Sequence, residues 1–125
     1  MKLSKVKLPV SKISLDMKPP FDITGKYRSN GINPNGTEYQ CDVVIKTMGD
    51  IFGVEWYFDN KLEYSGVGVF ANGLFVVSFL SHQAYGVMAY EIIDGKRLEG
   101  IWTGADTDGL GIEKLTKIDE NLDKK

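Results

Sequence analysis

The sequence predicts a single all-β domain, an antiparallel up-and-down meander barrel of about eight strands, and two observations support this fold class. Between residues 23 and 118, apolar and polar side chains alternate in short segments that end at turn signals, with no helical segment between them. The connections are too short for the crossovers that parallel strands require. Closure into a barrel removes exposed sheet edges, and a two-sheet β-sandwich is the alternative.

Each expected strand ends at residues that favour turns. Asn72-Gly73 and Asp94-Gly95 are the strongest hairpin signals, because both central residues of a type I′ turn need a positive φ. In order, the strands are expected at 23–29, 38–47, 51–58, 61–70, 74–80, 85–93, 97–103 and 110–118. The connections between them are expected at 30–36, 49–50, 59–60, 72–73, 81–83, 94–95 and 104–109.

The chain divides into a basic extension at 1–20, the barrel domain at 21–118 and a polar tail at 119–125. Lys18-Pro19-Pro20 ends the extension, because consecutive prolines favour extended backbone. The extension carries five lysines and one aspartate, whereas residues 21–112 carry six basic and twelve acidic side chains. A body of net negative charge repels phosphate backbones, so nucleic acid is not expected as a partner.

The composition also limits the compartment and the cofactors. No apolar run approaches the roughly 20 residues of a transmembrane helix, and lysines interrupt the first fifteen residues where a secretory signal would need an apolar core. We expect a cytoplasmic protein, or an exported one if a signal sequence was removed. Cys41 and His82 are the only cysteine and histidine, which excludes an internal disulfide and a thiolate-rich zinc site. No cofactor or metal is expected.

The inner face of the expected barrel carries aromatic side chains with polar tips, which suit a cavity that holds a small molecule. The alternative is that these tips bond to water or backbone at the barrel ends. Cys41 shares the inner face, and glycines at 25, 66, 68, 86, 100 and 111 relieve crowding or leave room opposite a large ring. The candidate ligand-binding residues are Tyr27, Trp56, Tyr64, Ser78, Tyr90, Trp102 and Glu113.

Glu113 is the most informative of these candidates, because an inward carboxylate is unfavourable unless it is paired or hydrated. Lys26, Arg28 or a tyrosine hydroxyl could pair with it in a structural hydrogen bond, and a polar ligand could do the same.

The segment 74–80 is apolar on both faces, which indicates that both faces are covered. Another subunit could cover it, and a homo-oligomer is the favoured expectation. The alternative cover is the extension itself, through Val6, Leu8 and Ile13. The candidate interface residues are Val67, Val69, Phe75, Val77 and Phe79.

Several motifs resemble a family of small bacterial β-barrel proteins, some of which are labelled fibronectin-binding. They are Gly25-Lys26-Tyr27, Asn33-Pro34-Asn35-Gly36, Tyr64-Ser65-Gly66-Val67-Gly68, Leu98-Glu99-Gly100-Ile101-Trp102-Thr103 and Gly111-Ile112-Glu113-Lys114-Leu115-Thr116. The resemblance covers residues 23–118 and implies a non-enzymatic, exported domain. In outline the meander is also similar to avidin and lipocalin barrels.

These observations favour a non-enzymatic β-barrel binding module, with a small molecule in its interior as the first hypothesis. The alternative is a protein-interaction or adhesion protein that acts through an outer apolar strand face. An enzyme is the third hypothesis, since Cys41 and His82 form the only thiol–imidazole pair and no catalytic motif accompanies them.

Overall fold

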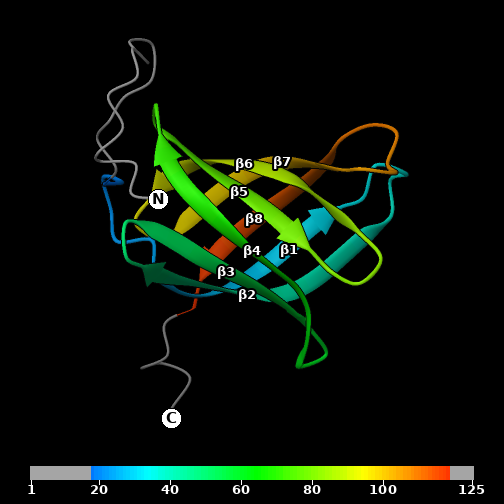
Figure 1. Ribbon diagram of the computed structural model, residues 1–125, viewed down its shortest axis with the longest axis horizontal. Helices are drawn as coiled ribbons and strands as arrows, with labels where there is room; N and C mark the ends of the chain where they lie inside the picture. The colour runs from blue at the N-terminus through cyan, green and yellow to red at the C-terminus, as the bar shows by residue number, and fades with distance from the viewer. Residues whose placement is uncertain (1–17, 119–125) are drawn as a thin grey trace.

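A computed structural model describes residues 18–118, which form a closed barrel of eight antiparallel strands, each paired with its neighbours in sequence and β8 paired with β1 (Figure 1). The predicted meander barrel is confirmed. Residues 1–17 of the extension and the tail at 119–125 lie outside the described residues. The strands are β1 (Gly25–Ile32), β2 (Glu38–Met48), β3 (Ile51–Phe58), β4 (Lys61–Ala71), β5 (Leu74–Leu80), β6 (Tyr85–Asp94), β7 (Arg97–Gly104) and β8 (Gly111–Lys117).

The first hairpin differs from the expectation, because Asn30 and Gly31 lie inside β1 and not in the loop. The Gln40 side-chain amide donates a hydrogen bond to the Asn30 side-chain oxygen, 2.9 Å away, across the β1–β2 pair. The loop begins at Asn33, whose backbone N–H donates to the Thr37 carbonyl oxygen at 2.7 Å. The loop therefore begins three residues later than the sequence predicts, at residue 33 and not at residue 30.

The two strongest turn signals both mark hairpins, but only one has the expected backbone. Asn72 and Gly73 have φ values of 52° and 77°, as a type I′ turn requires. Asp94 is the last residue of β6, and Gly95 lacks a positive φ. At this turn the Asp94 carboxylate accepts a 2.8 Å hydrogen bond from the Lys96 backbone N–H, so a side chain supports the chain reversal.

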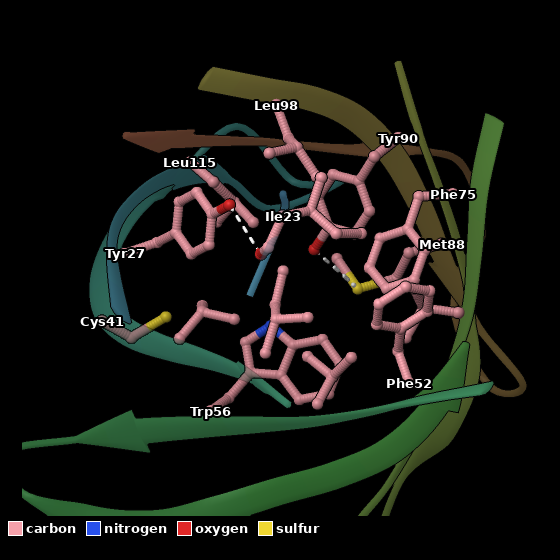
Figure 2. Close-up of a cluster of buried hydrophobic side chains, with 14 residues drawn as sticks. Ile23, Tyr27, Cys41, Phe52, Trp56, Phe75, Met88, Tyr90, Leu98 and Leu115 are labelled. Atoms are coloured by element: carbon pink, nitrogen blue, oxygen red, sulfur yellow. Dashed lines mark hydrogen bonds between the residues drawn. The ribbon is translucent and has the colours of Figure 1, made fainter. Parts of the chain in front are cut away.

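The two ends of the barrel are built differently. The mouth, at the right of Figure 1, is formed by the connections after β1, β3, β5 and β7. At the other end, the base, the segment before β1 turns inward and Ile23 is buried. The Tyr27 hydroxyl donates to the Ile23 carbonyl oxygen at 2.7 Å, which holds this segment in the barrel (Figure 2). The base is therefore filled by the chain itself.

The side chains of β5 point in the opposite directions from those expected: the residues expected outside the barrel lie inside it. Phe75 and Val77 are fully buried and Phe79 packs against the same core, so these three candidate interface residues point into the barrel. Ser78, expected inside, lies on the outer side, where its hydroxyl bonds to the backbone N–H and carbonyl of Val67 at 3.2 and 3.3 Å. Because β5 is apolar at nearly every position, hydrophobicity could not distinguish its two faces.

Candidate ligand-binding site

A cavity of about 200 Å³ lies inside the mouth of the barrel. Its lining combines side chains at the rim, which are partly exposed, with buried side chains beneath them. No lysine or arginine is among them. The lining residues are Asn33, Tyr39, Trp56, Phe58, Tyr64, Phe79, Met88, Trp102 and Glu113.

Five aromatic side chains form a closed circuit around this cavity, which we term the aromatic collar: Tyr39, Phe58, Tyr64, Phe79 and Trp102, from five different strands. Going round the circuit, successive ring centroids are 6.1, 6.2, 5.7, 6.0 and 6.3 Å apart, and the last distance returns from Trp102 to Tyr39. Four of the five pairs meet edge to face, which is a favoured geometry for aromatic rings. Each ring therefore supports its two neighbours.

Glycines opposite the rings make the collar sterically possible. A Cβ on Gly111 would lie 2.3 Å from the Trp102 ring, and one on Gly86 would lie 2.4 Å from the Phe79 ring. In both cases glycine and ring are direct cross-strand partners. Gly100 stands in the same relation to Tyr90 in the core below. The prediction that strand glycines leave room opposite large rings is confirmed at these three positions.

The floor of the cavity contains a buried carboxylate, Glu113, which is 1% exposed. Its Oε1 accepts a hydrogen bond from the Tyr39 hydroxyl at 2.8 Å, and its Oε2 accepts one from the Trp56 indole N–H at 3.2 Å. The Tyr90 hydroxyl also donates to Oε2. Of the pairings considered for Glu113, tyrosine hydroxyls are observed, whereas Lys26 and Arg28 pair with Asp42.

These hydrogen bonds and the low exposure alter the acidity of the surrounding groups. Burial, and then the negative charge of Glu113, raises the pKa of Tyr39 and of Tyr90 far above the ordinary tyrosine value. The same two causes raise the pKa of the Cys41 thiol to about 12. Both tyrosines therefore stay protonated and act as hydrogen-bond donors to the carboxylate.

The structure separates the candidate binding residues into three groups. Trp56, Tyr64, Trp102 and Glu113 line the cavity together. Tyr27 and Tyr90 face inward but lie in the core outside the cavity lining, with Tyr27 toward the base (Figure 2). Ser78 lies outside the barrel, as described above. Whether the four lining residues bind a ligand stays a prediction.

Sequence reasoning missed five lining residues, and for three of them the signal was present. Tyr39 alternates with Cys41, and Phe58 alternates with Trp56, so each shares a face with a residue already placed inside. Phe79 was assigned to the wrong face of β5. Met88 alternates in the same way with Tyr90, which was already placed inside. Asn33 lies in a loop, where alternation predicts nothing.

Two polar side-chain atoms are buried without a hydrogen-bond partner among residues 18–118, namely the Ser29 hydroxyl oxygen and the Trp102 indole nitrogen. Trp102 belongs to the collar, and its Nε1 lies close above Gly111. In the same part of the chain, no three His, Cys, Asp or Glu side chains gather where they could hold a metal ion.

Outside the barrel, six outward side chains form a continuous row of direct cross-strand partners from β4 through β5, β6, β7 and β8 to β1. We term this row the outer apolar band. Val76, Ile101, Ile112 and Ile32 within it are each at least 40% exposed. Of the candidate interface residues, Val69 is in the band and Val67 lies beside it. In order, the band consists of Val69, Val76, Ala89, Ile101, Ile112 and Ile32.

Comparisons with solved structures support the fold. A redesigned β-barrel superimposes with a TM-score of 0.60 at 10% sequence identity, over 77% of this chain and 91% of its own. A de novo designed fluorescence-activating β-barrel superimposes with a TM-score of 0.59 at 12% identity, over 76% and 93% of the two chains. The described residues include no helix of the length and apolar character that a membrane span needs.

The comparisons of sequence are negative. No protein-family model matches the chain, and no curated protein matches it significantly. The resemblance to fibronectin-binding proteins therefore stays a prediction, and what the comparisons establish is the architecture, that of an eight-stranded antiparallel β-barrel.

Proposed function

We propose that the barrel is a binding module for a small molecule of single-ring size, which enters at the mouth and rests on the floor formed by Trp56, Met88 and Glu113. The observation that carries this proposal is the closed aromatic collar around a cavity of about 200 Å³. A dry apolar cavity of about 150 Å³ is large enough to hold benzene, so the size suits one ring with a short substituent. The designed barrels share only the fold, and the proposal depends on the cavity of this chain.

Binding is favoured over catalysis by the surroundings of the two groups that could act as nucleophile and base. Cys41 is buried, and its raised pKa keeps the thiol protonated near neutral pH. His82 is exposed in the connection between β5 and β6. A nucleophile needs a base within hydrogen-bonding reach, whereas Cys41 is buried on β2 and His82 is exposed on a connection between two other strands.

The test uses the two tryptophans, because both line the cavity and the chain has no others. Phenol, a neutral single-ring probe, is titrated into isotopically labelled protein, and the two indole N–H resonances are followed by NMR. We expect saturable shifts of both resonances, while the amides of the outer apolar band stay unchanged. Shifts confined to the band, or no saturable shift at millimolar phenol, would contradict the proposal.

A matched pair of variants on one strand locates the binding. Phe79→Ala removes one ring of the collar, whereas Val76→Ala removes a smaller apolar group on the outer side of β5. We expect Phe79→Ala to weaken phenol binding by about tenfold, corresponding to the loss of roughly 1.4 kcal/mol, and Val76→Ala to leave it unchanged. Equal effects of the two substitutions would place the probe elsewhere.

A second candidate function is supported by the outer apolar band, which gives the protein-interaction alternative, adhesion included, a surface on this chain. Exposed apolar residues that are contiguous over several strands are typical of protein contacts. We propose a second copy of the chain as the partner. In sedimentation, Ile101→Lys is expected to convert a dimer into a monomer. The control is Thr116→Lys, at an exposed outward position of β8 outside the band. A monomeric wild-type protein would remove this candidate.

A further inference from the structure

The cavity floor holds a negative charge that no positive side chain among the described residues balances. Four ion pairs within residues 18–118 join Lys26 and Arg28 to Asp42, Lys46 to Glu55, and Arg97 to Asp94, and in each the basic side chain is solvent-exposed. Glu113, by contrast, meets only neutral donors within residues 18–118: two hydroxyls and one indole N–H. A buried carboxylate is normally paired with a cation or a metal, because neutral hydrogen bonds replace only part of its hydration.

The carboxylate also retains capacity for a further donor. Two carboxylate oxygens together offer about four acceptor positions. Oε2 already accepts from Trp56 and Tyr90, whereas Oε1 accepts only from Tyr39. Since Glu113 lines the cavity, the remaining position on Oε1 is available to a group that enters from the mouth.

The aromatic walls of the cavity, like the carboxylate on its floor, favour a positively charged ligand. The face of an aromatic ring is electron-rich and attracts a cation, and several rings around one space act together in this way. The aromatic collar and Trp56 together line the cavity with six aromatic rings. Residues 21–112 add six more acidic than basic side chains, twelve against six, so the field of the barrel body also attracts positive charge.

We propose that the cavity selects a single-ring ligand with a cationic N–H group, such as an amidinium or a protonated amine, which donates to Glu113 Oε1 while its ring lies within the aromatic collar. This inference rests on the proposed small-molecule function and specifies the chemical class of the ligand. One observation favours a different ligand: the unpartnered Trp102 indole N–H would be satisfied by a neutral amide that offers a carbonyl oxygen. The test must therefore include such an amide.

Benzamidinium, benzamide and benzoate have nearly the same size and shape and differ in charge. Each is titrated into the wild-type protein by calorimetry, and the two indole N–H resonances report whether it enters the cavity. We expect benzamidinium to bind at least tenfold more tightly than benzamide, a difference of about 1.4 kcal/mol or more, and benzoate to bind most weakly. Equal or tighter binding of benzamide or benzoate would overturn the charge selection and leave the small-molecule function standing. Failure of all three to shift the indole resonances would overturn the charge selection, and it would overturn the small-molecule function as well only if phenol also failed to shift them.

Two variants assign the preference to Glu113. Glu113→Gln keeps the size of the side chain and one acceptor oxygen but removes the charge, and Glu91→Gln removes the same charge from an exposed outer position on β6. We expect Glu113→Gln to abolish the preference for benzamidinium over benzamide and Glu91→Gln to retain it. Loss of the preference in both variants would assign it to the general field of the protein and overturn the role of Glu113.

The proposal can also be tested without Glu113→Gln, should that variant fail to fold. Nuclear Overhauser contacts in the wild-type complex report the orientation of benzamidinium. We expect the amidinium protons to lie near the Trp56 indole N–H, because that group shares the carboxylate. An amidinium group that points out of the mouth, with only the ring near Trp56, would overturn the proposal.

Discussion

The ring of Tyr39 occupies the space that a side chain on Gly31 would need: a Cβ built on Gly31 would lie 2.0 Å from Tyr39 Cζ and 2.4 Å from its hydroxyl oxygen. The two residues are direct partners across the β1–β2 pair. Gly31 is also the cross-strand partner of Glu113 on its other side, in the β1–β8 pair. One missing side chain therefore makes room for the hydrogen bond between the collar and the floor.

From this contact we expect Gly31→Ala to displace Tyr39 and to lower the free energy of unfolding by about 1–3 kcal/mol, as overpacking of a core does. Gly95→Ala is the control, because its Cβ would meet only Phe21, at an ordinary 3.5 Å, and Gly95 has no positive φ. Urea denaturation measures both variants. A Gly31→Ala protein as stable as the wild type would show that Tyr39 has free space to move into.

Tyr39→Phe tests how much a hydroxyl that bonds to a buried carboxylate contributes to the free energy of unfolding. Hydrogen bonds to charged groups contribute about 1.5–3 kcal/mol when buried, and we expect a loss in this range. Tyr57→Phe is a matched control, since the Tyr57 hydroxyl donates to Glu55 Oε1 at 3.1 Å on the outer surface. There we expect a smaller loss than at Tyr39, because solvent replaces the bond. Equal losses in thermal or urea denaturation would contradict the burial argument.

Val77→Lys and Val76→Lys test the facing of β5. Val77 is 1% exposed and points inward, whereas Val76 is 40% exposed and points outward. An unpaired charge in the core is expected to unfold the protein or to cost about 3 kcal/mol or more, while the outward lysine should change stability by less than about 0.5 kcal/mol. Circular dichroism melting curves distinguish the two. A larger loss of stability in Val76→Lys than in Val77→Lys would show that Val76 points inward, as the sequence predicts.

Stability is expected to fall at alkaline pH. Burial, and then the charge of Asp22, raises the pKa of Tyr27 from 10.0 to about 12, and burial raises that of Cys41 from 9.0 to about 12. The unfolded chain therefore loses these protons first, so the stabilisation is complete below about pH 9 and declines as pH rises toward 12. Each group contributes a slope of about 1.4 kcal/mol per pH unit within its window.

Urea denaturation between pH 7 and 11 measures this slope. Tyr27→Phe should reduce it, and Tyr85→Phe should not, because Tyr85 is 61% exposed in the folded protein. A stability that stays level up to pH 11 would show that these groups ionise as readily in the folded state as in the unfolded chain.

Cys41 is expected to resist thiol reagents until the protein unfolds. Its thiol is 3% exposed and its pKa of about 12 leaves almost no thiolate at pH 8. A disulfide reagent should label the native protein at the rate of unfolding and label denatured protein immediately. Cys41→Ala, which has no thiol, is the negative control. Rapid labelling of native protein would indicate that the barrel opens near β2.

The sequence predicted the barrel well because its determinants are local. Asn72-Gly73 and the short connections specify hairpins without reference to distant residues, and alternation in 38–47 and 51–58 assigns the inner face directly. In 74–80 the same rule fails, since Phe75, Val76 and Val77 are all apolar and either facing satisfies the pattern. There the pairing of β5 with β4 and β6 decides, and that information is not local.

The site was predictable in its composition and not in its geometry. Trp56, Tyr64, Trp102 and Glu113 were identified by alternation, because their polar or aromatic character contrasts with an apolar core. Tyr39 and Phe58 share those faces, but nothing in the sequence places them at the same height as Trp102. That height follows from the stagger of eight strands around the barrel, which only the three-dimensional register provides.

Ile23 fills the base of the barrel, and the cavity described above lies at the opposite end, inside the mouth. In the binding mode proposed above, a molecule on the floor would enter and leave through the mouth. Any ligand longer than the cavity must extend past Asn33 into solvent at the mouth. In the same binding mode, a dye, an affinity resin or a crosslinker attached to the outer end of a ligand would not disturb its buried end, so immobilised single-ring amines are suitable probes for the proposed binding.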